Sequence, residues 1–215
     1  MTESAERPPV VWAIVVAAGS GRRFGGAKQY ADLAGRRVVD WAVDGARSVA
    51  DGVVLVVRAD AAAEPEPAVD VVVAGADARS GSVRAGLAAV PGDAEVVLVH
   101  DGARPLAGHG VFRAVVDAVL TGADAAVPVV EVIDSISDPH GVPVDRASLR
   151  AVQTPQGFSA EVLRRVHAGA PEATDDASLV VAAGGRVRLV AGERWNLKVT
   201  DPDDLAVAEA LLERR

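Results

Sequence analysis

The chain has 215 residues, of which half are apolar, and it carries a formal net charge of −8 at neutral pH. This length suits a single domain, predicted over 10–215 after a flexible tail at 1–9, and the acidic balance argues against broad binding to nucleic acid or anionic membranes. The sequence contains no cysteine, which excludes disulfides and thiolate chemistry. It has no apolar run of membrane-spanning length and no signal-like start, which favours a cytoplasmic protein.

The first part of the chain alternates apolar runs with helical patterns. We predict strands over 10–16, 52–57, 69–73, 95–100 and 125–130, with helices over 38–50, 80–90 and about 110–120 between them. The strands are continuous valine-rich runs rather than patterns that alternate apolar with polar residues. Such runs indicate an α/β fold in which a Rossmann-like, mostly parallel sheet is covered by helices on both faces.

This rhythm breaks between residues 131 and 152, where short strand-like pieces surround a turn at 138–141. The segment predicts a protruding β-hairpin arm whose apolar residues have no following helix to cover them. After the arm we expect helices from about residue 159 and over 175–183, a strand over 187–190 and a last helix. Asp175 and Asp176 are expected to cap the helix that they precede, and Asp201 the last helix, which would begin at Pro202.

The first strand ends in a glycine-rich loop with the composition of a phosphate site. The loop reads Ala17-Ala18-Gly19-Ser20-Gly21-Arg22-Arg23, and Lys28-Gln29 follows. Small residues let backbone N–H groups approach an anion, and arginine and lysine add positive charge. Lys28 and Lys198 are the only two lysines of the chain, and both fall in motif-like segments.

Two well-known phosphate loops do not fit this segment. A dinucleotide-binding turn would need glycine at position 24, where Phe24 stands. A P-loop would need lysine directly after Gly26 and a magnesium-binding hydroxyl after that lysine, but Ala27 intervenes and Gln29 replaces the hydroxyl. The loop therefore indicates triphosphate binding without the geometry of a hydrolase, or else an ordinary strand-to-helix turn.

Further polar residues follow other predicted strands. In open parallel sheets, ligands bind beyond the carboxyl ends of the strands, so the loops 17–28, 75–82 and 101–105 are expected to meet there. They offer backbone donors, the Ser82 hydroxyl and the Asp101 carboxylate. A serine at a helix start or an aspartate before glycine also serves as a cap. The four histidines show no ligand spacing, so any metal would arrive with the substrate.

Six segments, taken in order, resemble one enzyme family. They are AAGSGRR at 17–23 with KQ at 28–29, RSGSV at 79–83, VHDGARP at 99–105, VQTPQGF at 152–158, TDDAS at 174–178 and LKVT at 197–200. The set is similar to the cytidylyltransferases of the non-mevalonate isoprenoid pathway, which join 2-C-methyl-D-erythritol 4-phosphate to CTP. The first segment occurs in many sugar-nucleotide transferases, whereas the ordered set is specific.

The resemblance implies roles for residues around the nucleotide. Arg23 and Lys28 would stabilise the transition state at the α-phosphate of CTP, and Mg²⁺ would be bound with the CTP phosphates. Asp101 and Arg104 would lie beside the ribose and the incoming sugar phosphate. Small residues and one hydroxyl would form the cytosine and ribose site: Ala17, Ala18, Gly19, Gly75 and Ser82.

The resemblance also implies how the second substrate is held. Arg146, Thr154 and Lys198 would contact methylerythritol phosphate, and Arg146 and Lys198 would position its phosphate for attack. The arm at 131–152 resembles the dimerisation arm of the family. A homodimer is therefore expected, in which Arg146 and Ser135 reach the pocket of the partner subunit and the active sites are shared.

Three departures from the family pattern leave alternatives open. Ala27 stands where proline is usual, in a loop between Arg23 and Lys28 that is short. Ser137 replaces a lysine of the arm, and the segment before Lys198 is the unusual Glu193-Arg194-Trp195-Asn196, so Lys198 is carried over without its neighbours. Arg22 is interpreted as a solvated surface residue. A ribitol-5-phosphate cytidylyltransferase would share nearly every motif, and a nucleotide-binding module without turnover would share the first loop.

Overall fold

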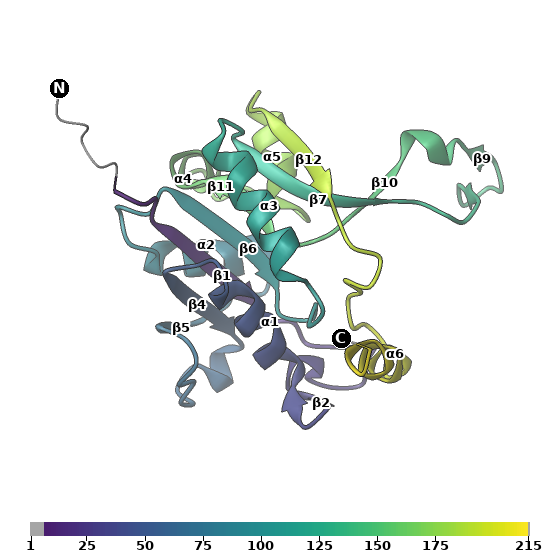
Figure 1. The fold of residues 1–215 in the computed structure, drawn as a ribbon, viewed down its shortest axis with the longest axis horizontal. Helices are drawn as coiled ribbons and strands as arrows, with labels where there is room; N and C mark the ends of the chain where they lie inside the picture. The colour runs from purple at the N-terminus through teal and green to yellow at the C-terminus, as the bar shows by residue number, and fades with distance from the viewer. Residues whose placement is uncertain (1–6, 215) are drawn as a thin grey trace.

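A computed structural model describes residues 7–214, so most of the predicted tail lies outside the described residues. Its centre is an eight-stranded sheet (Figure 1). The strands are β1 (Val11–Val16), β4 (Gly52–Val57), β5 (Val71–Ala74), β6 (Val96–Asp101), β7 (Ala125–Glu131), β10 (Arg150–Val152), β11 (Gln156–Ser159) and β12 (Val187–Ala191). The helices are α1 (Val38–Arg47), α2 (Arg79–Ala89), α3 (His109–Leu120), α4 (Ala160–His167), α5 (Asp176–Ala182) and α6 (Asp203–Leu212).

The sheet is mostly parallel, as predicted. Its order is β10-β7-β11-β6-β1-β4-β5, and β12 pairs with β7. The β6-β1-β4-β5 neighbours run parallel to one another, as do β7 and β12. β11 runs antiparallel to both β6 and β7, and β10 runs antiparallel to β7. The carboxyl ends of β1, β4, β5 and β6 therefore meet at one edge of the sheet.

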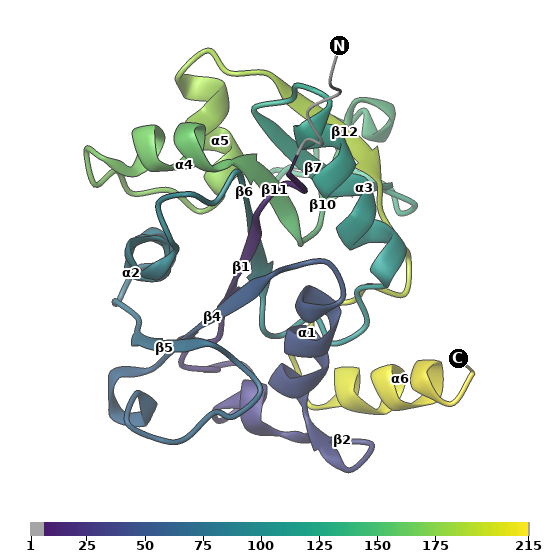
Figure 2. The ribbon, with the colours of Figure 1, turned by 60° about the vertical axis from the view of Figure 1, so that its left-hand side comes forward.

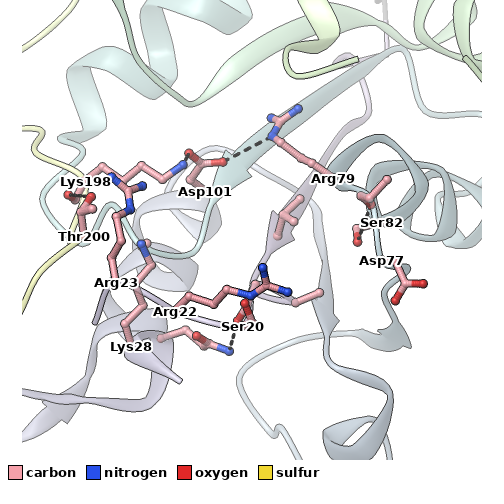
Figure 3. A pocket seen from close by; sticks show the side chains of 18 of the residues that line it. Ser20, Arg22, Arg23, Lys28, Asp77, Arg79, Ser82, Asp101, Lys198 and Thr200 are labelled. Atoms are coloured by element: carbon pink, nitrogen blue, oxygen red, sulfur yellow. Dashed lines mark hydrogen bonds and ion pairs between the residues drawn. The ribbon is translucent and has the colours of Figure 1, made fainter. Parts of the chain in front are cut away.

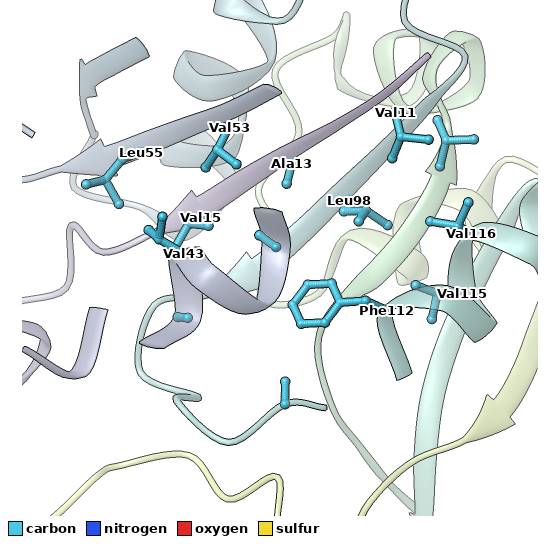
Figure 4. Close-up of a cluster of buried hydrophobic side chains, with 14 of the residues drawn as sticks. Val11, Ala13, Val15, Val43, Val53, Leu55, Leu98, Phe112, Val115 and Val116 are labelled. Carbon is cyan, nitrogen blue, oxygen red and sulfur yellow. The ribbon is translucent and has the colours of Figure 1, made fainter. Parts of the chain in front are cut away.

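Helices cover both faces of the sheet, which confirms the predicted layers (Figure 2). On one face, α1 and α3 pack onto β1, β4 and β6 through Val43, Phe112 and Val115 (Figure 4). On the other face, α2, α4 and α5 bury Val83, Leu163 and Val180. Because both faces are covered, the central strands are apolar at nearly every position, which is the origin of the valine runs.

β11 was not predicted from the sequence. Phe158 is its one large apolar side chain, so the segment has no strand-like pattern of its own. Its burial comes from partners distant in sequence, because β6 and β7 flank it and α3 lies against it. A Cβ at Gly157 would lie 3.0 Å from the Val115 carbonyl oxygen of α3, so the glycine permits this close approach. The short hairpin of β2 (Asp32–Leu33) and β3 (Arg36–Arg37) was also not predicted.

The predicted arm projects from the body of the protein (Figure 1). Its strands β8 (Ile136–Ser137) and β9 (Pro143–Val144) pair antiparallel around a turn in which Asp138 accepts the N–H groups of His140 and Val142. A 3-10 turn, η3 (Arg146–Ser148), then leads into β10. Ile133 and Val142 remain 61% and 57% exposed, so the described chain does not cover the apolar surface of its own arm.

The predicted helix caps differ from the structure. Asp175 precedes α5, but its carboxylate accepts a hydrogen bond from Gln156 Nε2 at 2.7 Å, and Asp176 is buried against other side chains. Pro202 is the N-cap residue of α6 rather than its first helical residue. The Oδ2 atom of Asp204, and not the Asp201 side chain, accepts the N–H groups of Thr200 and Asp201, because Asp204 is the second residue of the helix and its side chain reaches back.

Candidate active site

A cavity of about 580 Å³ lies at the carboxyl ends of β1 and β6. The loop after β1, the start of α2 and the segment before α6 line it (Figure 3). Arg23, Lys28 and Lys198 gather on one side of the cavity, whereas Asp77 and Ser82 lie on the other. Residues from three loops predicted to meet are therefore brought together, and the segment of Lys198 joins them from the far end of the chain.

The glycine-rich loop closes on itself between Gly21 and Gly26. Gly21 has a φ of +64°, and a Cβ there would lie 1.7 Å from the Gly26 carbonyl oxygen. The Gly26 N–H group donates to the Gly21 carbonyl at 3.3 Å, and the Lys28 N–H group donates to the Gly26 carbonyl at 2.8 Å. This closure carries the chain into the 3-10 turn η1 (Lys28–Tyr30), so the short loop still delivers Lys28 to the cavity.

Lys28 is held against the segment of Lys198. Its Nζ atom donates a hydrogen bond to the Val199 carbonyl at 2.5 Å. Burial, followed by the charges of Lys198 and Arg23, lowers the pKa of Lys28 below its ordinary value of 10.5. Three cations thus share one side of the cavity, an arrangement that favours an anionic ligand there.

Because the pKa of Lys28 is lowered, we predict that activity falls at a lower alkaline pH than it would with an ordinary lysine. A lysine with a depressed pKa loses its charge at a lower pH than usual, whereas arginine keeps its charge throughout this range. If the cavity binds the CTP that the resemblance implies, the Lys28→Arg variant should retain its kcat/KM for that nucleotide to higher pH, whatever its absolute rate. Rate profiles of the two proteins between neutral and alkaline pH measure this shift. If the activity of both proteins fell at the same alkaline pH, a group other than Lys28 would be responsible for the fall.

Asp101 stands between several cations. Its Oδ2 atom accepts a hydrogen bond from Lys198 Nζ at 2.7 Å, and Arg79 Nε lies 3.8 Å from its Oδ1 atom. Burial by itself would raise the pKa of Asp101, but Lys198, Arg79 and Arg104 together lower it to about 2. The carboxylate is therefore ionised at neutral pH, where it can hold Lys198 in place but cannot supply a proton.

Thr154 and Arg104 lie behind the cavity wall instead of lining it. The Thr154 hydroxyl is buried, where it accepts the Asp101 N–H group at 3.0 Å and donates to His100 Nδ1 at 3.1 Å. Burial lowers the pKa of His100 to about 4, so the neutral ring donates from Nε2 to the Arg104 carbonyl at 3.3 Å. The Arg104 guanidinium donates to the Asn196 carbonyl at 2.7 Å. Thr154 thus holds Asp101, and Arg104 holds the Lys198 segment. The predicted contacts of Thr154 and Arg104 with substrate stay predictions.

Gly75 and Ser82 shape the opposite wall. The Ser82 hydroxyl accepts the Ala76 N–H group at 3.1 Å and donates to the Ala78 carbonyl at 3.2 Å. A Cβ at Gly75 would lie 2.5 Å from Ala18 Cβ and 2.9 Å from Ser82 Oγ. Gly75 is therefore required for the close approach of two loops. It lines a neighbouring hollow of about 560 Å³, together with Ala18 and Gly19.

Two arginines that line the cavity were not chosen from the sequence. Arg22 lines it as Arg23 does, and both arginines are exposed, so the interpretation of Arg22 as a solvated residue stays a prediction. The local pattern does not distinguish Arg22 from Arg23, which both follow a glycine-rich turn, and the choice of Arg23 rests on the resemblance. Arg79 is the first residue of the RSGSV segment at 79–83. Its ion-pair partner Asp176 is 97 residues away, so no local pattern links the two residues.

Arg146 and Ser135 lie on the arm, outside the cavity of their own chain. Both are exposed, and the Arg146 guanidinium donates to the Ile133 carbonyl within the arm. Their predicted contacts with substrate therefore stay predictions.

Residues 7–214 contain neither a metal-binding cluster of side chains nor a membrane-spanning helix. No group of three or more histidine, cysteine, aspartate or glutamate side chains in this part of the chain is placed to hold a metal ion. Within the same residues, no helix has both the length and the apolarity that crossing a membrane requires.

Comparison with known proteins gives one consistent result. The family of 2-C-methyl-D-erythritol 4-phosphate cytidylyltransferase matches residues 11–214. The enzymes of that name from Nocardia farcinica and Rhodococcus opacus are 44% and 46% identical to the chain, over 95% and 96% of its length and of theirs. The crystal structure of the Thermus thermophilus enzyme is 37% identical, with a TM-score of 0.83, and the match covers 95% of this chain and 99% of that one. The chain therefore belongs to the 2-C-methyl-D-erythritol 4-phosphate cytidylyltransferase family and is a cytidylyltransferase of the non-mevalonate isoprenoid pathway.

Proposed function

We propose that the cavity binds CTP and 2-C-methyl-D-erythritol 4-phosphate and joins them into CDP-methylerythritol with release of pyrophosphate. The observation that carries the assignment is the convergence of both lysines of the chain on one cavity. Lys28 is fixed there by the Val199 carbonyl, 171 residues away, and Lys198 by Asp101, 97 residues away. Two ammonium groups held by such distant contacts are placed for a common anionic ligand.

The proposed chemistry needs no covalent bond to the protein. A phosphate oxygen of methylerythritol phosphate attacks the α-phosphorus of CTP, a new P–O bond forms, and the bond to the β-phosphate oxygen breaks as pyrophosphate leaves in line. Negative charge builds up around the α-phosphorus, and preorganised cations stabilise that charge more than they stabilise bound CTP. Lys28 and Arg23 would supply this stabilisation, while Lys198 would position the phosphate of the second substrate.

Mg²⁺ would enter with the triphosphate. The acidic side chains that line the cavity are Asp77 and Asp101, and Asp101 is already paired with Lys198. A lining with few free carboxylates fits an ion that takes most of its oxygen ligands from phosphates and water, as Mg²⁺ commonly does. When bound, the ion would neutralise charge on the triphosphate.

Pyrophosphate release tests the proposal directly. Release should require CTP and methylerythritol phosphate together, and CTP with D-ribitol 5-phosphate should give a much lower kcat/KM. Comparable rates with ribitol phosphate would reassign the acceptor. If CTP bound but no mixture released pyrophosphate, the cavity would bind a nucleotide without catalysing the proposed transfer.

CTP should be preferred to ATP by at least about a hundredfold in kcat/KM. The wall formed by Ala18, Gly75 and Ser82 is tightly packed, and a base that does not match the polar groups of such a site leaves them unpaired and loses affinity. Initial rates with each nucleotide at fixed methylerythritol phosphate measure the ratio. Equal turnover with ATP would contradict the assignment of this wall to cytosine.

The Lys198→Ala variant should raise the KM for methylerythritol phosphate by about tenfold or more and leave CTP affinity nearly unchanged. A charge-assisted contact to a substrate phosphate is worth at least this factor. Lys198→Arg, which keeps the charge beside Asp101, is the matched control and should lie closer to the parent protein. A rise in the CTP dissociation constant with no change in the second KM would contradict the role given to Lys198.

A homodimer that shares its active sites through the arm is part of the same proposal. The exposed Ile133 and Val142 form apolar surface that a partner would cover, and a two-fold pair is the commonest closed assembly. The partner's cavity would then receive Arg146 and Ser135, which lie far from the cavity of their own chain. Residues 10–215 would act as one nucleotidyltransferase domain in the cytoplasm.

A further inference from the structure

A row of hydrogen-bonded polar side chains runs from the cavity into the protein between α2, α4 and α5. Arg79 Nη1 donates to Asp176 Oδ2 at 2.5 Å, and His167 Nε2 lies 3.1 Å from Asp176 Oδ1. At its other end, the Arg79 guanidinium faces Asp101 (Figure 3). Arg79 lines the cavity, whereas the side chains of Asp176 and His167 are 1% and 2% exposed. The proposed chemistry uses neither buried residue.

Asp176 requires both of its partners. An ionised carboxylate is costly to bury unless its oxygens are paired and hydrogen-bonded. Each oxygen here has one such partner, so Arg79 and His167 hold the carboxylate from two sides. Burial would raise the pKa of Asp176, but His167 and Arg79 together lower it. Without the His167 bond, the carboxylate would be free to rotate and would fix Arg79 less well.

His167 makes one hydrogen bond and leaves its second ring nitrogen unpaired. Its Nδ1 atom is buried without a hydrogen-bond partner among the described residues. A protonated Nδ1 would be an unsatisfied buried donor, so the favoured tautomer carries the proton on Nε2 and donates it to Asp176. An apolar residue would fill the same volume with no unpaired nitrogen. The bond to Asp176 is therefore the one interaction that a histidine adds at this position.

The three residues stand at the ends of three helices. Arg79 begins α2, Asp176 begins α5, and His167 ends α4. The packing of these helices therefore sets the position of Asp176 relative to Arg79. Because the guanidinium is planar, fixing Nη1 also fixes the direction in which Nε faces Asp101.

We propose that His167 is a positioning residue for cytidylyl transfer, which acts through Asp176 to fix Arg79 at the cavity wall beside Asp101. Arg79 in turn orients Asp101 and contacts the bound nucleotide. The inference rests on the proposed function, because it gives Arg79 a nucleotide to bind. His167 itself touches no substrate.

The His167→Leu variant removes the donor at similar volume and should raise the KM for CTP about tenfold with little change in kcat, which is the scale of one hydrogen bond to a charged group. His167→Gln, whose amide can donate to Asp176, should restore most of the affinity. With Arg79 replaced by glutamine, His167→Leu should cause no further rise, because its effect passes through Arg79. An unchanged KM in His167→Leu, or an equal rise on the Arg79→Gln background, would overturn the proposal.

Leu163→Val is the matched control for a general loss of stability. Leu163 is fully buried one turn earlier on α4, and its substitution loosens the same helix without touching Asp176. At an equal fall in Tm, Leu163→Val should keep the parent KM for CTP. A rise equal to that of His167→Leu would show a merely structural effect and overturn the positioning role.

A measurement without substrate separates this inference from the proposed function. The order parameter of the Arg79 Nε–H group, obtained by NMR, should fall in His167→Leu and stay at the parent value in His167→Gln. If the parent protein released no pyrophosphate from CTP, the proposed function would fail, while the order parameters would still decide whether His167 fixes Arg79. Equal order parameters in all three proteins would refute that link.

Discussion

Replacing Lys28 by alanine should lower kcat by about two to three orders of magnitude, which is the scale for removing one preorganised donor from a developing charge. Its ammonium group is fixed by the Val199 carbonyl before substrate arrives, so it needs no rearrangement during the reaction. The dissociation constant of CTP should change by less than about tenfold, because the extra charge exists only in the transition state. Pyrophosphate release and calorimetric titration with CTP measure the two effects.

Variants of three arginines complete this experiment. Arg22→Ala and Arg23→Ala show which of the two adjacent cavity arginines acts with Lys28, and we expect the large fall in kcat for Arg23. Arg188→Ala is the control, because Arg188 is an exposed cation on β12 that pairs with Thr121 and is absent from the cavity lining. If Lys28→Ala weakened CTP binding and left kcat unchanged, the assignment of Lys28 to the transition state would be wrong.

Mixing inactive Lys28→Ala protein with inactive Arg146→Ala protein should restore about a quarter of the parent activity once subunits have exchanged. At equal amounts about half of the dimers are mixed, and each mixed dimer has one site with an intact cavity and an intact partner arm. Arg146 lies on the exposed arm, outside the cavity of its own chain, which is the basis for this expectation. Activity is followed over time, and mass spectrometry of labelled subunits confirms the exchange.

A second mixture provides the control. Lys28→Ala and Lys198→Ala both damage the same cavity, so their mixed dimers contain no intact site, and the mixture should show no activity beyond that of the two unmixed variants. Rescue in this control would mean that the two lysines act in different subunits. If the first mixture stayed inactive despite proven exchange, Arg146 would act within its own chain, and the shared site would have to be abandoned.

The sheet could be predicted because its strands carry their own signal. The valine runs of β1, β4 and β6 follow directly from burial on two faces, and the same runs place the following loops at one edge. β11 carries no such signal, because its burial is imposed by β6 and β7 on either side. Strands that depend on distant partners are the ones that a local pattern misses.

The candidate site was predictable in position but only partly in detail. The segments of Lys28, Asp101 and Lys198 are recognisable locally, and the cavity brings them together. For Thr154, only the fold shows that the hydroxyl is hydrogen-bonded to His100 and to the Asp101 N–H group, and its predicted contact with substrate stays a prediction. Asp176 was interpreted as a cap for the same reason, since its partner Arg79 is 97 residues away.

A crystal structure with CTP, Mg²⁺ and methylerythritol phosphate tests the central claim most directly. The triphosphate should lie in the cavity of about 580 Å³, with the α-phosphate in contact with Lys28 and the base beside Gly75 and Ser82. The phosphate of methylerythritol phosphate should lie near Lys198, within reach of Arg146 of the partner subunit. A triphosphate bound away from Lys28 and Lys198 would contradict the account.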